Sequence, residues 1–184
     1  MTSCIIRQVS KNEKNKLYRL FSTGSGGLLL IIFLFLRPGV SFGQQSPGNS
    51  DTTQGPPFIA QGQLLFLRHG TNSLIKMITI QIAHNEAERA EGLMWRRYMP
   101  EDDGMLFIFR NQEIQAFWMK NTYIPLDMVF ADSTGKIVSI HANAVPFSEA
   151  TISSGTPAQY VVEVNGGFCA RYGVKEGDKI EFER

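Results

Sequence analysis

The sequence predicts a mainly β fold, a small antiparallel barrel- or sandwich-like domain with two short helices. Three observations favour this class: short segments rich in β-branched and aromatic residues recur along the chain, turn signals separate them, and only two segments have helical character. Of the 184 residues, the single β-rich domain is expected to cover residues 64–184. That length is sufficient for a packed hydrophobic core.

Eight segments have the composition of strands, and two pairs of them are expected to form hairpins. The turn-rich sequence HGTNS at residues 69–73 separates the first pair, and DSTG at residues 132–135 forms a tight turn within the second. The expected strands cover residues 64–68, 76–83, 105–109, 115–120, 125–131, 136–141, 159–164 and 179–183.

Two short helices are expected between these strands. Asn85 and Glu88 have the spacing of a capping box, in which each side chain accepts a hydrogen bond from the backbone of the other residue. The helix would cover residues 86–91 and end at Gly92, a residue that favours the left-handed conformation of a helix C-terminus. The second helix would lie in GGFCARYG, residues 166–173.

The first 43 residues have the order of a secretory signal peptide. A basic segment precedes the apolar run of residues 28–36, and Ser41 and Gly43 are small residues suited to a cleavage site. Arg37 and Pro38 interrupt the run, whereas a membrane span needs roughly 20 apolar residues. We expect an exported protein, periplasmic or extracellular after cleavage near Gly43. The length of the basic segment leaves an uncleaved membrane anchor as the alternative.

The remaining chain is expected to begin with a flexible linker, residues 44–63, rich in Gln, Ser, Thr, Gly and Pro. After cleavage, 12 Lys and Arg would stand against 16 Asp and Glu. This balance, without a basic tract, argues against nucleic acid as a partner. Cys169 would be the only cysteine left, so an internal disulfide is excluded, and we interpret it as a buried structural residue.

Several segments together resemble one family. They are EAERAEGLMWR, MPEDDGMLFIF, FWMKNTYIPLDMVF, GKIVSIHANAVPFSE, YVVEVNGG and YGVKEGDKIEF. Their order and spacing resemble the domain of unknown function 192 family over about residues 76–182, and WMKNTYIPLDM is the most specific part. The resemblance implies a small domain that often follows a bacterial signal peptide. It supplies no activity and no catalytic residue.

Polar side chains interrupt several of the otherwise apolar strands. Because side chains alternate between the two faces of a strand, Lys120, Asp127, His141 and Glu163 are expected to converge in one semi-apolar cavity, with Asn121 at its rim. Carboxylates, an imidazole and an ammonium group in such a cleft would shift one another's pKa values, as ligand sites require. The alternatives are that these faces are solvated, or that Lys120 and Asp127 form a structural pair.

We therefore expect the domain to bind a small molecule or an envelope partner in a cleft near Asp127 and His141. One alternative is a hydrolase or lyase that uses these two residues as an acid–base pair. Another is a structural interaction module. No cofactor is expected. A metal site of Asp127, His141 and Glu163 is a weaker alternative, because no pair of histidines has the spacing of a metal motif. The membrane would be a partner only through an uncleaved leader.

Overall fold

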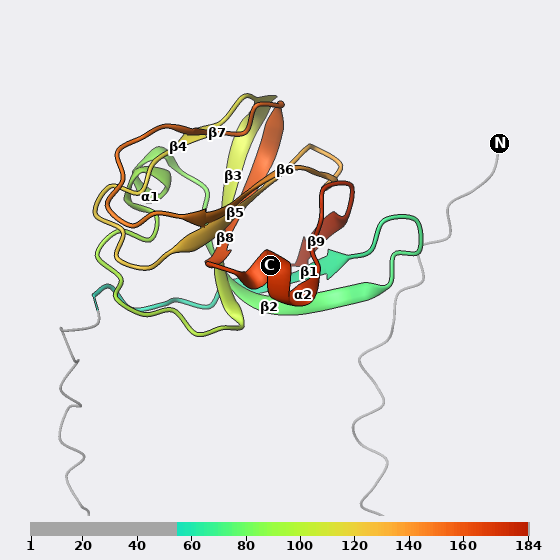
Figure 1. The fold of residues 1–184 in the computed structure, drawn as a ribbon, viewed down its shortest axis with the longest axis horizontal. Coiled ribbons are helices and arrows are strands. Elements are labelled where there is room, and N and C mark those ends of the chain that lie inside the picture. The colour runs from blue at the N-terminus through green and yellow to red at the C-terminus, as the bar shows by residue number, and fades with distance from the viewer. Residues whose placement is uncertain (1–54, 184) are drawn as a thin grey trace, which may run out of the picture. The chain divides into compact units, whose positions relative to one another are not determined.

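A seven-stranded sheet dominates the computed structural model, which describes residues 55–183 (Figure 1). Its strands are β1 (Gly62–Leu67), β2 (Leu74–Ala83), β3 (Asp103–Glu113), β5 (Leu126–Ala131), β6 (Ile137–Ala144), β8 (Ala158–Asn165) and β9 (Lys179–Glu183). They are ordered β6–β5–β8–β3–β2–β1–β9 across the sheet. The expected leader and most of the expected linker lie outside the described residues.

A two-stranded sheet and two short helices complete the described domain. The small sheet pairs β4 (Ala116–Phe117) with β7 (Ile152–Ser153), and the helices are α1 (Glu86–Glu91) and α2 (Phe168–Tyr172). The capping box of α1 is present, with the Glu88 amide donating to Asn85 Oδ1 over 2.9 Å. The mainly β class with two short helices is confirmed.

The large sheet curls without closing into a barrel. Its edge strands β6 and β9 are not paired along their length, and an isolated bridge joins Lys136 to Lys179 near their ends. Beside it, the Ile180 amide donates to the Gly135 carbonyl over 2.8 Å. Gly135 has a φ of 81°, and a side chain there would meet the Ile180 carbonyl oxygen. Of the two expected architectures, the sandwich-like one therefore describes this domain.

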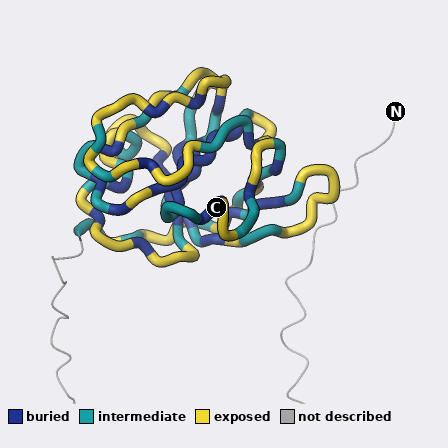
Figure 2. The backbone as a smooth tube through the Cα atoms, viewed as in Figure 1, coloured by how far each residue is buried: buried dark blue, intermediate teal, exposed yellow. Residues whose placement is uncertain are grey.

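The two faces of the sheet support two hydrophobic clusters. The first cluster includes Phe66, Ile80, Val162 and Phe168, and α2 packs on this face through the contact between Phe66 and Phe168, whose ring centroids are 5.3 Å apart. The second includes buried residues from the loops around α1 and β4 and from the strands: Leu93, Met105, Phe107, Met119, Met128 and Phe130. In Figure 2, buried residues are concentrated in the strands that cross the centre of the view. Every residue of β5 is buried.

The strands differ from expectation in three respects: one pairing, one length and one starting residue. The β2–β3 pair is parallel, because the segment that contains α1 connects the two strands as a crossover. The strand expected over residues 115–120 is only two residues long, and a turn follows it in which Asn121 has a φ of 55°. β1 begins at Gly62, two residues before the expected domain start. The two predicted hairpins, β1–β2 and β5–β6, are confirmed.

No helix within residues 55–183 is long and apolar enough to cross a membrane.

Candidate functional site

Asp127 is a structural carboxylate at the centre of the domain. Its side chain is fully buried, with 0% of the residue exposed. Oδ1 accepts hydrogen bonds from the amides of Asn143 (2.8 Å) and Gly167 (3.0 Å), and Oδ2 accepts one from the Cys169 amide (2.8 Å). The carboxylate thus fixes the irregular end of β6 and the first turn of α2, whose N-terminal Gly167 has no side chain to cap the helix.

Asp127 and His141 point to opposite faces of the sheet. Glu163 pairs with Met105 and Met128, and Met128 pairs with His141, so these four residues form one row on the face of the second cluster. Asp127 precedes Met128 along β5 and therefore points to the other face. The predicted convergence of Asp127 with His141 and Glu163 is wrong, and so is the geometry of the acid–base alternative and of the three-residue metal site.

Two of the five predicted site residues, Lys120 and Glu163, do line one pocket. We call it the Glu163 pocket; its volume is about 280 Å³. Its walls come from α1 and the loop that follows it, from β3, from β4 and the segment after it, and from β8. The aromatic and apolar part of the lining comprises Leu93, Met94, Phe107, Phe109, Phe117 and Trp118. The charged residues that line it are Glu86, Arg89, Glu91, Lys120 and Glu163.

The Glu163 carboxyl is almost wholly buried and has no partner within residues 55–183. The residue is 4% exposed, and none of the hydrogen bonds or ion pairs within residues 55–183 involves its side chain. The fully buried side-chain atom without a partner in this part of the chain is Arg96 Nε, so the Glu163 oxygens still reach the space of the pocket. Burial raises the pKa of Glu163 to about 8. A carboxyl with this pKa is mostly protonated at neutral pH, so it offers an O–H donor and a carbonyl acceptor to the pocket.

Lys120 lines the Glu163 pocket, whereas Asn121 lies next to the lining residue Met94 and does not line the pocket itself. The Lys120 ammonium lies over the Trp118 ring, 5.0 Å from its centroid. Asn121 holds two rim loops together, because its carbonyl accepts a hydrogen bond from the Trp95 amide over 2.8 Å. His141 is exposed and does not line the pocket. Ligand binding by Lys120, Asn121 and Glu163 stays a prediction.

The rim loops also present an exposed aromatic cluster that the sequence interpretation missed. The Tyr123 ring lies 6.4 Å from Trp95 and 4.8 Å from Phe147, and the Arg97 guanidinium lies 4.5 Å from the Tyr123 centroid. Trp95 is 50% and Phe147 54% exposed. Both adopt a positive φ, 68° and 60°, which is strained for side chains other than Gly and Asn. Such strain clusters at functional sites, and it leaves no signal in the sequence.

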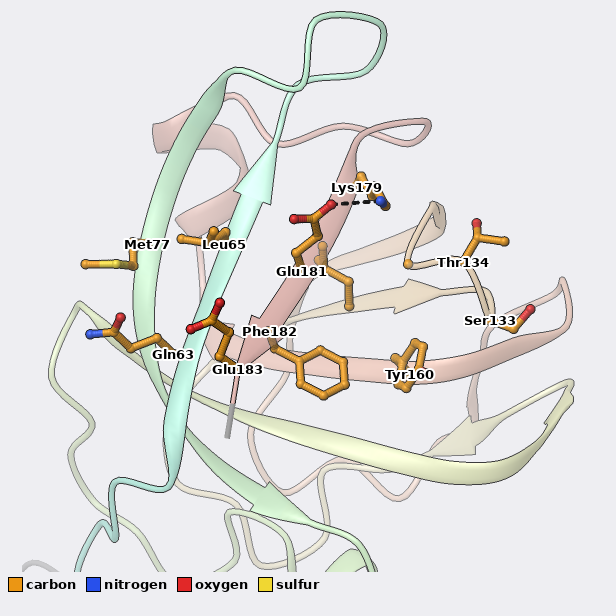
Figure 3. Close-up of a pocket in the computed structure, with 12 residues that line it drawn as sticks. Gln63, Leu65, Met77, Ser133, Thr134, Tyr160, Lys179, Glu181, Phe182 and Glu183 are labelled. Atoms are coloured by element: carbon orange, nitrogen blue, oxygen red, sulfur yellow. Dashed lines mark hydrogen bonds and ion pairs between the residues drawn. The ribbon is translucent and has the colours of Figure 1, made fainter. Parts of the chain in front are cut away.

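A second, larger pocket of about 570 Å³ lies beside the edge strand β9. The Phe182 and Tyr160 rings pack side by side there, and Lys179 pairs with Glu181 over 2.8 Å (Figure 3). The polar side chains that the structure describes in this pocket are exposed or half-buried. They are open to solvent or to one another, so this pocket has no nearly buried carboxyl like that of Glu163.

Cys169 is a buried free thiol. Burial, together with the neighbouring Asp127 carboxylate, raises the pKa of its thiol, which keeps the sulfur protonated and unreactive. Within the described part of the chain, no three His, Cys, Asp or Glu side chains form a group that could hold a metal ion.

The sequence of this domain matches one known family. The model of the DUF192 family, described as "Uncharacterized ACR", matches residues 67–182. The chain belongs to the DUF192 family. The resemblance expected from the sequence is thereby confirmed. No curated protein matches the chain.

Two solved structures resemble this DUF192 domain. One, from Sinorhizobium meliloti 1021, belongs to a protein provisionally described as a transcription regulator; it is 42% identical, has a TM-score of 0.64, and the match covers 70% of this chain and 98% of that one. The other, a protein of unknown function from Novosphingobium aromaticivorans DSM 12444, is 32% identical with a TM-score of 0.62. That match covers 73% of this chain and 99% of the other.

Proposed function

We propose that this DUF192 domain binds a small, largely apolar organic ligand in the Glu163 pocket. The observation that carries the proposal is the Glu163 carboxyl, which is 4% exposed, lines an aromatic pocket and has no hydrogen-bond partner within residues 55–183. A nearly buried carboxyl without a protein partner is unfavourable unless water or a ligand reaches it from the pocket. Perturbed carboxyls in clefts are concentrated at functional sites, where a ligand supplies the missing partner.

The size and lining of the pocket restrict the ligand. A volume of about 280 Å³ lies just below the usual range for small-molecule sites, about 300–1,000 Å³. It suits a molecule of roughly ten non-hydrogen atoms, or one side chain of an envelope partner. Phe107, Phe117 and Trp118 provide flat apolar contact. Two buried polar residues line the pocket: the Thr122 hydroxyl donates to the Lys120 carbonyl, which leaves the Glu163 carboxyl to fix the orientation of a ligand.

Filling the mouth of the pocket is expected to abolish ligand binding. Ala90 lies on α1, is exposed and lines the pocket, so Ala90→Trp should block it without disturbing the core. Ala87→Trp is the matched control, because Ala87 is exposed on the same helix but does not line the pocket. In a ligand-observed NMR screen of small aromatic and aliphatic compounds, hits should survive in Ala87→Trp and disappear in Ala90→Trp. Hits that persist in both variants would place binding elsewhere.

We also propose that the domain acts after export. The basic segment, the apolar run of residues 28–36 and the small residues Ser41 and Gly43 support this. The intact mass of the protein produced from the full chain tests it: a mature form beginning at Gln44 is expected, and an unprocessed chain in the cytoplasm would contradict it.

A nucleic-acid role, as the provisional description of the Sinorhizobium relative would suggest, has weaker support in this chain. The residues after Gly43 contain 12 Lys and Arg against 16 Asp and Glu. Proteins that bind nucleic acid use clustered basic side chains to neutralise phosphates. The acidic balance therefore argues against nucleic acid as the partner.

A further inference from the structure

We propose that the ligand of the Glu163 pocket is an organic cation, an alkylammonium or guanidinium group whose positive charge pairs with the Glu163 carboxylate. This inference rests on the proposed ligand-binding function and names its chemical class. Three features of the pocket carry it: the missing counter-charge, the aromatic walls and the balance of charge along the lining.

The two cations that line the pocket lie over two of its own aromatic rings and do not pair with Glu163. Arg89 Nη1 donates to the carbonyls of His84 (2.8 Å) and Ile108 (3.2 Å), and its guanidinium lies over the Phe109 ring. The Lys120 ammonium lies over Trp118. Neither forms an ion pair with Glu163, so the carboxyl has space for a charge that the ligand brings.

The walls of the pocket suit a positive charge. Aromatic faces attract cations through their quadrupole, and desolvated sites strengthen this attraction. Phe117 is held in place by edge contacts with Phe107 (centroids 5.1 Å apart) and Phe130 (6.0 Å). The pocket therefore combines fixed aromatic side chains with a carboxyl in one lining, a composition complementary to an ammonium group attached to an apolar body.

The net charge of the lining also favours a cation. With Glu163 ionised, the lining carries three carboxylates, Glu86, Glu91 and Glu163, against the two cations Arg89 and Lys120. One monovalent cation would balance this set. An anion would instead add to the excess negative charge of the lining.

Cation binding must be coupled to loss of a proton. The Glu163 carboxyl is mostly protonated at neutral pH, so pairing with a cation releases that proton, and affinity rises about tenfold per pH unit until the free carboxyl is ionised. The other titratable or charged groups on this face are Glu86, Arg89 and Glu91 of the α1 segment, Lys120 of the rim and His141 of β6. Because histidine commonly changes charge near neutral pH, His141→Gln serves as a control.

Three probes of one shape test the inference on protein produced from the full chain. The probes are 2-phenylethylammonium, 2-phenylethanol and phenylacetate, which share a ring and chain but differ in charge. Titrations followed by NMR or calorimetry should show the ammonium binding at least tenfold more tightly than the others, with affinity rising about tenfold between pH 6 and 7. Glu163→Gln should weaken its binding at pH 8 at least tenfold and remove the pH dependence, whereas His141→Gln should retain both.

Three other outcomes would overturn the inference, each on a different ground. If the alcohol or the carboxylate binds as well as the ammonium, and Ala90→Trp removes that binding, the ligand is not a cation but the pocket still binds ligands. If the affinity for the ammonium falls as pH rises, protonated Glu163 is the binding form and the ion pair is wrong. If none of the probes binds at millimolar concentration, the cation inference fails, and the compound screen with Ala90→Trp and Ala87→Trp decides the proposed function separately.

Discussion

Asp127→Ala is expected to lower the free energy of unfolding by about 3–5 kcal/mol. The substitution removes three hydrogen bonds to a charged acceptor and leaves the amides of Asn143, Gly167 and Cys169 without that partner in the interior. Urea denaturation followed by circular dichroism measures the change. Asp127→Asn keeps one acceptor oxygen and should lose an intermediate amount of stability.

The matched control is His141→Ala, because His141 is exposed on the neighbouring strand. Its effect should remain within about 0.5 kcal/mol. If Asp127→Ala is as stable as the wild type, the buried carboxylate does not organise α2 and the end of β6, and its place in the architecture must be revised.

Glu163→Gln is expected to abolish a large pH dependence of stability. Burial raises the pKa of Glu163 to about 8 in the folded state, from an ordinary value of 4.5. Between these values the folded protein holds a proton that the unfolded chain has lost, so the free energy of unfolding falls as pH rises. The loss should reach on the order of 4–5 kcal/mol by pH 8 and then level off.

Denaturation curves of wild type and Glu163→Gln at several pH values between 4 and 9 measure this difference. The variant should equal or exceed the wild type in stability at pH 8, since it removes the burial of an unpaired acid. Glu149→Gln, an exposed substitution of the same type, should keep the wild-type pH profile. Parallel profiles for wild type and Glu163→Gln would show that Glu163 titrates normally in the fold.

Local patterns predicted the elements of this domain well. The capping pair Asn85 and Glu88 marks the start of α1, and the DSTG turn marks the β5–β6 hairpin. Both signals depend on neighbours within a few residues. The parallel β2–β3 pair depends on how the chain returns after α1, and β7 contains only Ile152 and Ser153, too short for a pattern.

The candidate site was only partly predictable for the same reason. Alternation tells which residues of one strand share a face, and it correctly separates Asp127 from Met128. It does not tell which faces of different strands coincide, because register shifts such as the one between Leu126 and Met128 intervene. One signal was available: Gly167 cannot cap α2, so the amides of that turn required an acceptor from elsewhere, and Asp127 is that acceptor.

The most direct test of the account is a ¹³C NMR titration of the Glu163 carboxyl, assigned by comparison with Glu163→Gln, with and without 2-phenylethylammonium. The account predicts an apparent pKa of about 8 in the free protein, and a clear decrease when the cation occupies the pocket. An ordinary carboxyl titration in the free protein, or a raised pKa that the cation leaves unchanged, would contradict it.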